Sequence, residues 1–117
     1  IFVAGVMHHI PRESLQTEIS KICGLLTEKG RVIVFEHNPY NPVTRRLVST
    51  CEFDVGAELI SKRKLINQFN KAGHSLQVAK NGYCLFFPPA LKALSFLERF
   101  LRKMPFGGQY FVQFKKI

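Results

Sequence analysis

Three of the four histidines and one carboxylate stand directly after two apolar runs of the sequence. His8 and His9 follow the run 1–7, while Glu36 and His37 end the second run. Imidazole exchanges a proton near neutral pH, and a carboxylate can orient or deprotonate a nucleophile. We therefore take His8 and Glu36 as the candidate catalytic groups of a proton-transfer site.

These residues also have structural interpretations. His9, which precedes Ile-Pro, could bond to the backbone of the following helix, and Glu36 could be a cap or an ion-pair partner. No metal site is expected from His8, His9, Glu36 and His37. Neighbouring residues on one strand point to opposite faces, so the two adjacent histidines could not easily reach one ion.

Two buried strands joined by an amphipathic helix would position these side chains. Residues 1–7 and 31–36 are apolar runs typical of strands buried on both faces. Between them apolar residues recur at helical spacing from Leu15 to Leu26, and Gly30 is expected in the left-handed conformation that ends such a segment. Strand, helix and strand in this order predict a parallel pair with a right-handed crossover. The carboxyl ends of both strands, where ligands bind in such sheets, then form one rim.

The second half of the chain is expected to contain further helices and strands. Helices are predicted over 43–50, over 62–72 with Ser61 as its N-cap and Gly73 as its stop, and over 90–104 with Leu94, Leu97 and Leu101 facing inward. Strand pieces over 76–79 and 83–87 precede a break at Pro88 and Pro89. They form either a hairpin or one strand and a loop. Alternation over 109–116 predicts a final strand with Tyr110, Val112 and Phe114 on one face.

Composition excludes several classes of protein. The 117 residues suit one domain, and the longest apolar run is far shorter than a membrane helix requires. Three cysteines without a CxxC pair indicate free thiols in a reducing cytoplasm, with neither a zinc site nor a disulfide framework. A net charge of +9 would suit a polyanion, but the basic residues are scattered, so nucleic-acid binding is possible and not favoured.

Five segments carry a resemblance to a known family. Phe2–Pro11 (FVAGVMHHIP) resembles the fourth strand and following loop of class I S-adenosylmethionine-dependent methyltransferases, with a VLHHI-like tag. Leu25–Val34 resembles the LxPGGx turn and fifth strand, although Glu28 and Lys29 replace the Pro and the first Gly. The segment 36–45 (EHNPYNPVTR) resembles the Asn-Pro loop of a type 11/12-like bacterial subgroup. The segments 86–88 (FFP) and 105–110 (PFGGQY) resemble the same subgroup.

The resemblance implies an α/β fold, namely the C-terminal half of a Rossmann-like methyltransferase sheet with mainly parallel strands and an antiparallel last strand. Residues 1–117 would then be a partial domain whose N-terminal cofactor-binding half is absent. This agrees with a first residue that already lies in a strand-like run.

The implied activity is methyl transfer from S-adenosylmethionine by the intact protein, with the fragment inactive by itself. The resemblance assigns Ala4, Gly5 and His9 to the cofactor. It assigns His8, Glu36, His37, Asn38 and Tyr40 to the acceptor pocket, with a small-molecule or glycan-like acceptor. Two alternatives remain open: a non-catalytic α/β module that dimerises through its exposed first strand, and a basic RNA-associated methyltransferase.

Overall fold

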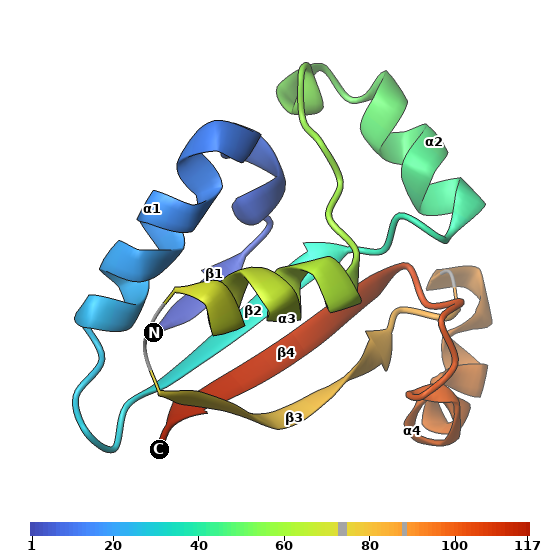
Figure 1. Ribbon diagram of the computed structural model, residues 1–117. Coiled ribbons are helices and arrows are strands. Elements are labelled where there is room, and N and C mark those ends of the chain that lie inside the picture. The colour runs from blue at the N-terminus through green and yellow to red at the C-terminus, as the bar shows by residue number, and fades with distance from the viewer. Residues whose placement is uncertain (73–74, 88) are drawn as a thin grey trace.

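The chain folds into a mixed sheet of four strands with helices packed on one face (Figure 1). The computed structural model describes residues 1–72, 75–87 and 89–117, so the expected roles of Gly73 and Pro88 lie outside the described residues. The strands are β1 (Phe2–Ala4), β2 (Arg31–His37), β3 (Leu76–Cys84) and β4 (Gln109–Lys116). The helices are α1 (Arg12–Gly24), α2 (Pro42–Thr50), α3 (Lys62–Lys71) and α4 (Glu98–Leu101), with 3-10 helices η1 (Met7–His9), η2 (Glu52–Asp54) and η3 (Pro89–Leu97).

The strand directions confirm the predicted fold class. In the sheet order β1-β2-β4-β3, β1 and β2 are parallel, whereas β4 is antiparallel to both of its neighbours. Three strands therefore run one way and the last strand runs the other way. The two predicted strand pieces over 76–79 and 83–87 do not form a hairpin. Residues 76–84 form the single strand β3, which has a register irregularity between Val78 and Lys80.

One face of the sheet carries the hydrophobic core. Tyr110, Val112 and Phe114 of β4 are fully buried on this face, as their alternation predicted. Helices α1 and α3 lie side by side over it (Figure 1), and Phe69 of α3 stacks on Phe114 with 4.2 Å between the ring centroids. Ser61 caps α3 as predicted, since its hydroxyl accepts a hydrogen bond from the Lys64 amide.

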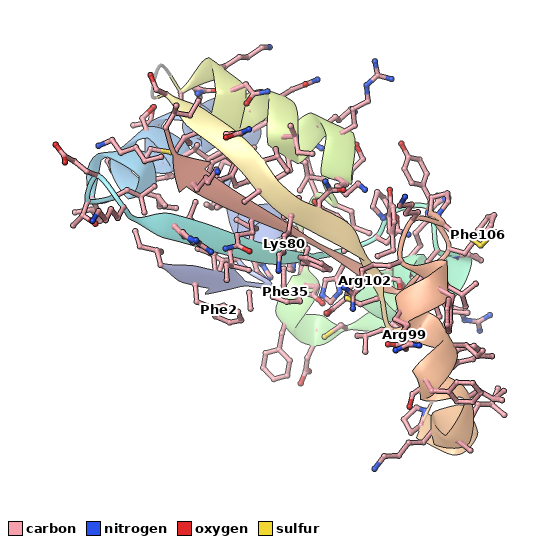
Figure 2. All side chains as sticks on the ribbon, turned by 90° about the horizontal axis from the view of Figure 1, so that it is seen from below. Phe2, Phe35, Lys80, Arg99, Arg102 and Phe106 are labelled. Atoms are coloured by element: carbon pink, nitrogen blue, oxygen red, sulfur yellow. The ribbon has the colours of Figure 1, made fainter. Side chains whose placement is uncertain are left out.

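The opposite face of the sheet carries aromatic rings that are not fully covered. Phe2 stands 5.6 Å from Phe35, and Phe35 stands 5.7 Å from Phe111, measured between ring centroids. Figure 2 shows this face, with Phe2 and Phe35 on the strands and Arg102 beside the sheet. The Arg102 guanidinium lies 5.9 Å from the centre of the Phe111 ring. Phe2 is 67% exposed because β1 is the edge strand.

The first strand is shorter than predicted. β1 ends at Ala4, and residues 7–9 form the 3-10 helix η1. Gly5 adopts φ of 63°, a conformation that glycine takes at little cost, and this turns the chain away from the sheet. Gly30 does not take the predicted positive φ. A Cβ on Gly30 would lie 2.9 Å from the Thr27 backbone, so the close approach of the chain is what requires glycine there.

The predicted helix over 90–104 is wrong. This segment forms the 3-10 helix η3, with non-helical dihedral angles at Leu91, and then one short turn of α-helix in α4. Leu94, expected to face inward, is 39% exposed. Figure 1 shows η3 and α4 at the end of the molecule, away from the face that α1 and α3 cover. An amphipathic pattern holds a helix mainly through tertiary packing, and this stripe packs against little of the sheet.

Candidate functional site

The buried carboxylate of Glu36 organises the rim where β1 and β2 end. Glu36 is the sixth residue of β2 and is 1% exposed. Its Oε1 accepts hydrogen bonds from the amides of Val6 at 3.0 Å and Met7 at 2.6 Å, and its Oε2 lies 2.6 Å from Nδ1 of His8. Three partners satisfy the buried charge, as a carboxylate inside a protein requires.

The predicted rim is present, but its two adjacent histidines are arranged differently from the expectation. His8 and His9 belong to a 3-10 helix and not to a strand, so their rings lie on the same side with centroids 4.1 Å apart. Nε2 of His8 is 3.3 Å from Oδ1 of Asp54, and Nε2 of His9 is 3.2 Å from the same oxygen. His37 completes the group, with its ring centroid 4.9 Å from that of His8.

Asp54 is the site residue that sequence reasoning missed. It ends the short 3-10 helix η2, in a loop between α2 and α3 that carries no motif. Two contacts bring this loop to the rim: the Glu58 amide donates to the His8 carbonyl at 2.9 Å, and Arg12 pairs with the Glu58 carboxylate at 2.6 Å. Both contacts join residues about 50 positions apart, so no local pattern could reveal them.

The surroundings of His8 and His37 shift their pKa values in opposite directions. The hydrogen bond to Glu36 raises the pKa of His8 above its ordinary value of 6.5, although burial opposes the shift. Burial lowers the pKa of His37, and the neighbouring His8 lowers it further. At neutral pH the rim therefore pairs an easily protonated imidazole with one that stays neutral.

The other predicted site residues have differing surroundings. Asn38 is fully buried, and its side-chain amide donates to the carbonyls of Pro105 at 2.9 Å and Gly107 at 2.7 Å. Its Oδ1 accepts from the Tyr40 amide, so this side chain holds two loops together and has little capacity left for a substrate. Tyr40 is 63% exposed at the rim, while Ala4 is exposed and Gly5 is half-buried at the end of β1.

An open pocket lies beside Asp54. It has a volume of about 500 Å³ and runs between α2, which contributes Arg45, Val48 and Ser49, and the loop residues Asp54 to Ala57. Its wall includes both a guanidinium and a carboxylate. The pocket is large enough for a small polar molecule and reaches the histidine group through Asp54.

Comparison with known proteins shows which fold the chain shares. No protein-family model matches the chain, and no curated protein matches it by sequence. Among solved structures it resembles a Thermotoga maritima SAM-dependent methyltransferase described as a possible histamine N-methyltransferase, with TM-score 0.71 and 14% identity over 99% of this chain and 55% of that one. It also resembles a SAM-dependent methyltransferase of Archaeoglobus fulgidus, with TM-score 0.68 and 11% identity over 99% and 57% of the two chains.

A third similar structure contains the product of the cofactor. The N-methyltransferase NodS of Bradyrhizobium japonicum, in complex with S-adenosyl-L-homocysteine, matches with TM-score 0.59 and 13% identity over 99% of this chain and 44% of that one. The chain thus spans about half the length of these proteins. It has the fold of part of a class I SAM-dependent methyltransferase domain.

No helix among the described residues is both long and apolar enough to cross a membrane.

Proposed function

We propose that this chain is the acceptor-side part of a class I methyltransferase domain, and that the intact protein transfers a methyl group from S-adenosylmethionine to a small-molecule or glycan-like acceptor. One observation carries the proposal: a methyltransferase-like sheet places the buried His8–Glu36 pair where its two parallel strands end. Ligands bind beyond the carboxyl ends of such strands.

Different residues would serve the cofactor and the acceptor. Ala4 ends β1, Gly5 and His9 follow it, and all three are assigned to the methionine end of the cofactor. His37 ends β2, Tyr40 follows it, and both are assigned to the acceptor. We give Asn38 a positioning role instead, because its hydrogen bonds are made within the chain.

His8 is the proposed base, and Glu36 acts through it. Both oxygens of Glu36 are occupied, whereas Nε2 of His8 points toward Asp54 and the rim. The acceptor oxygen or nitrogen would attack the methyl carbon in line with the bond to sulfur. That bond breaks, its electron pair stays on sulfur, and the acceptor proton passes to Nε2 of His8. Glu36 stabilises the imidazolium so formed, and positioning supplies much of the remaining rate.

The experiment uses the full-length protein that contains this chain. We expect it to bind S-adenosylhomocysteine in calorimetry, and His8→Gln to abolish methyl transfer from labelled S-adenosylmethionine to a metabolite extract while leaving that affinity within about threefold. A full-length protein without affinity for S-adenosylhomocysteine would disprove the proposal. The 117-residue chain alone should bind the cofactor poorly, and micromolar affinity would contradict its status as a partial domain.

Self-association through β1 is the second candidate. Among the described residues β1 pairs only with β2, so its outer edge offers backbone groups for pairing, and Phe2 lies exposed beside it. A second copy of the chain would add its own β1 to this edge. Light scattering should then give a dimer mass that Phe2→Lys reduces to that of the monomer, and a monomeric wild-type chain would exclude this function.

A further inference from the structure

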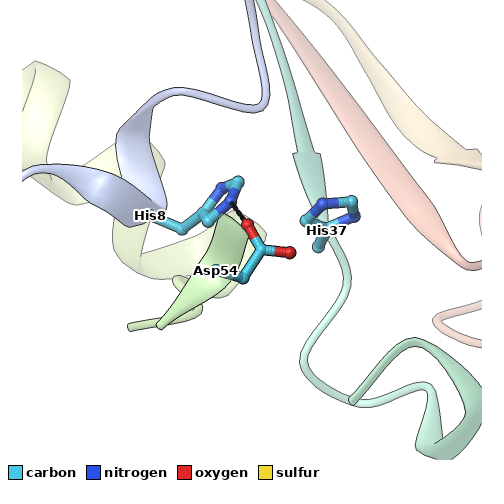
Figure 3. A group of neighbouring side chains, drawn as sticks. All are labelled: His8, His37 and Asp54. Carbon is cyan, nitrogen blue, oxygen red and sulfur yellow. Dashed lines mark hydrogen bonds and ion pairs between the residues drawn. The ribbon is translucent and has the colours of Figure 1, made fainter. Parts of the chain in front are cut away.

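Three side chains from distant parts of the chain converge on one point of the rim. His8 comes from η1, His37 from the end of β2 and Asp54 from η2, as Figure 3 shows. Two ring nitrogens and one carboxylate oxygen of these residues all lie within 4.8 Å of one another. His8 is buried and the other two are half-buried, so the group is partly shielded from water.

The hydrogen bond to Glu36 leaves two hydrogen-bond acceptors facing each other, one on His8 and one on Asp54. Ionised Glu36 can only accept, so Nδ1 of His8 carries the proton in that bond. In the neutral imidazole, Nε2 then carries a lone pair, and this lone pair faces Oδ1 of Asp54 at 3.3 Å. Two acceptors at this distance are stable only with a proton or a metal cation between them.

We propose that His8, His37 and Asp54 bind a divalent transition-metal ion, with Zn²⁺ as the reference ion. Two imidazoles and one carboxylate are the protein ligands of many catalytic zinc sites, which leave a further position open. Glu36 fits the usual partner of such a histidine, a carboxylate on the ring nitrogen that does not bind metal. Tetrahedral bonds of about 2.0–2.2 Å place two donors about 3.4 Å apart. Nε2 of His8 and Oδ1 of Asp54 already lie 3.3 Å apart, so His37 is the ligand that would rotate inward on binding.

The open position of the ion has a role in the proposed methyl transfer. Asp54 also lines the pocket of about 500 Å³ that contains Arg45 and Ser49. An ion at this edge would occupy Nε2 of His8 and bind an oxygen of the acceptor. It would then favour deprotonation of the acceptor in place of the His8 base, and the proton would leave to water. This role of the ion rests on the proposed function. Metal binding itself is measured without cofactor or acceptor, so a failure of metal binding can be distinguished from a failure of the proposed methyl transfer.

The test titrates Zn²⁺ into the chelator-treated, metal-free full-length protein that contains this chain, in a calorimeter. We expect one bound equivalent, and a visible d–d absorption band when Co²⁺ replaces Zn²⁺. Glu36→Gln should weaken binding about 10- to 100-fold, as the loss of an outer-shell partner does. The reason is the tautomer: the new amide N–H donates to Nδ1 of His8, which moves the ring proton to Nε2 and removes the lone pair.

Ligand variants and matched controls locate the ion. Asp54→Asn and His37→Gln should each weaken Zn²⁺ binding by more than Glu36→Gln does. Glu52→Gln removes the same charge from the same 3-10 helix and should retain the wild-type affinity, because Glu52 is exposed and is not a ligand.

Three results would overturn the proposal. The first is a wild-type protein that binds neither Zn²⁺ nor Co²⁺. The second is wild-type affinity in both Asp54→Asn and His37→Gln, with circular dichroism showing that these variants are folded. The third is a thiolate-to-cobalt charge-transfer band, which would place the ion on a cysteine.

Discussion

Nδ1 of His8 and Oε2 of Glu36 share a buried hydrogen bond of 2.6 Å although the two residues stand 28 positions apart in the chain. The same carboxylate accepts from the amides of Val6 and Met7, so it fixes the turn that carries His8 as well as the ring itself. Glu36 thus joins the ends of the two parallel strands.

The free energy of unfolding of the metal-free chain should fall as the pH rises through the folded-state pKa of His8. The Glu36 hydrogen bond raises that pKa above 6.5, so the folded state binds the proton more tightly than the unfolded chain. The resulting stabilisation is complete below the unfolded-state pKa and is lost above the folded-state pKa.

Urea denaturation from about pH 5 to about pH 9 measures this change, and His8→Gln should flatten it above about pH 6.5. His37 acts in the opposite direction, because burial and then His8 lower its pKa. The stabilisation from His37 is lost as the pH falls below 6.5, so His8 and His37 affect the free energy of unfolding in different pH ranges. A wild-type stability that increases with pH above about 7 would contradict the prediction.

Asn38→Ala should destabilise the fold by about 2–4 kcal/mol, because it removes two donors and one acceptor from a buried connection. The carbonyls of Pro105 and Gly107 would lose their partner, and the loop before β4 would loosen. Asn67→Ala, on the exposed side of α3, is the matched control and should change stability by less than about 0.5 kcal/mol. Equal effects of the two substitutions in urea denaturation would count against the structural role of Asn38.

Gly107→Ala should destabilise the fold by about 1–3 kcal/mol, the usual cost of overpacking. A Cβ at Gly107 would meet the Cys84 carbonyl and lie 3.0 Å from the Cys84 nitrogen, both of which are backbone atoms. Gly24→Ala is the control, because a Cβ there meets nothing within 4 Å. Gly24 ends α1, so alanine at this position should stabilise the folded protein by up to about 1 kcal/mol. Thermal unfolding should therefore move in opposite directions for the two variants, and a shared direction would refute the packing argument.

Tyr110→Phe should cost about 1–3 kcal/mol. The fully buried Tyr110 hydroxyl donates to the Ile60 carbonyl at 2.7 Å, and phenylalanine would leave that carbonyl without this donor. Tyr40→Phe removes a hydroxyl from an exposed ring and should leave the stability within about 0.5 kcal/mol of wild type. The urea midpoints of the two variants give the difference in their free energies of unfolding. Equal midpoints would show that the Ile60 carbonyl finds another donor.

Local periodicity was sufficient to predict several elements of the fold. The apolar run of β2, the alternation in β4 and the N-cap of α3 each act within a few residues, so their signals lie in adjacent sequence. The strand–helix–strand order also predicted that His8, Glu36 and His37 would share one rim, since a right-handed parallel crossover leaves few other arrangements. These features follow from short-range stereochemistry and from chain connectivity.

Tertiary contacts decided the rest. β1 ends early because Gly5 turns the chain and the Glu36 carboxylate binds the amides that follow. None of the described residues of η3 or α4 is buried, so the apolar stripe of this segment gains little from packing and its periodicity does not produce a regular helix. The loop that carries Asp54 is held at the rim by the contacts of Glu58 with His8 and Arg12. Such contacts join residues tens of positions apart, and their energies depend on the folded geometry, which no local pattern encodes.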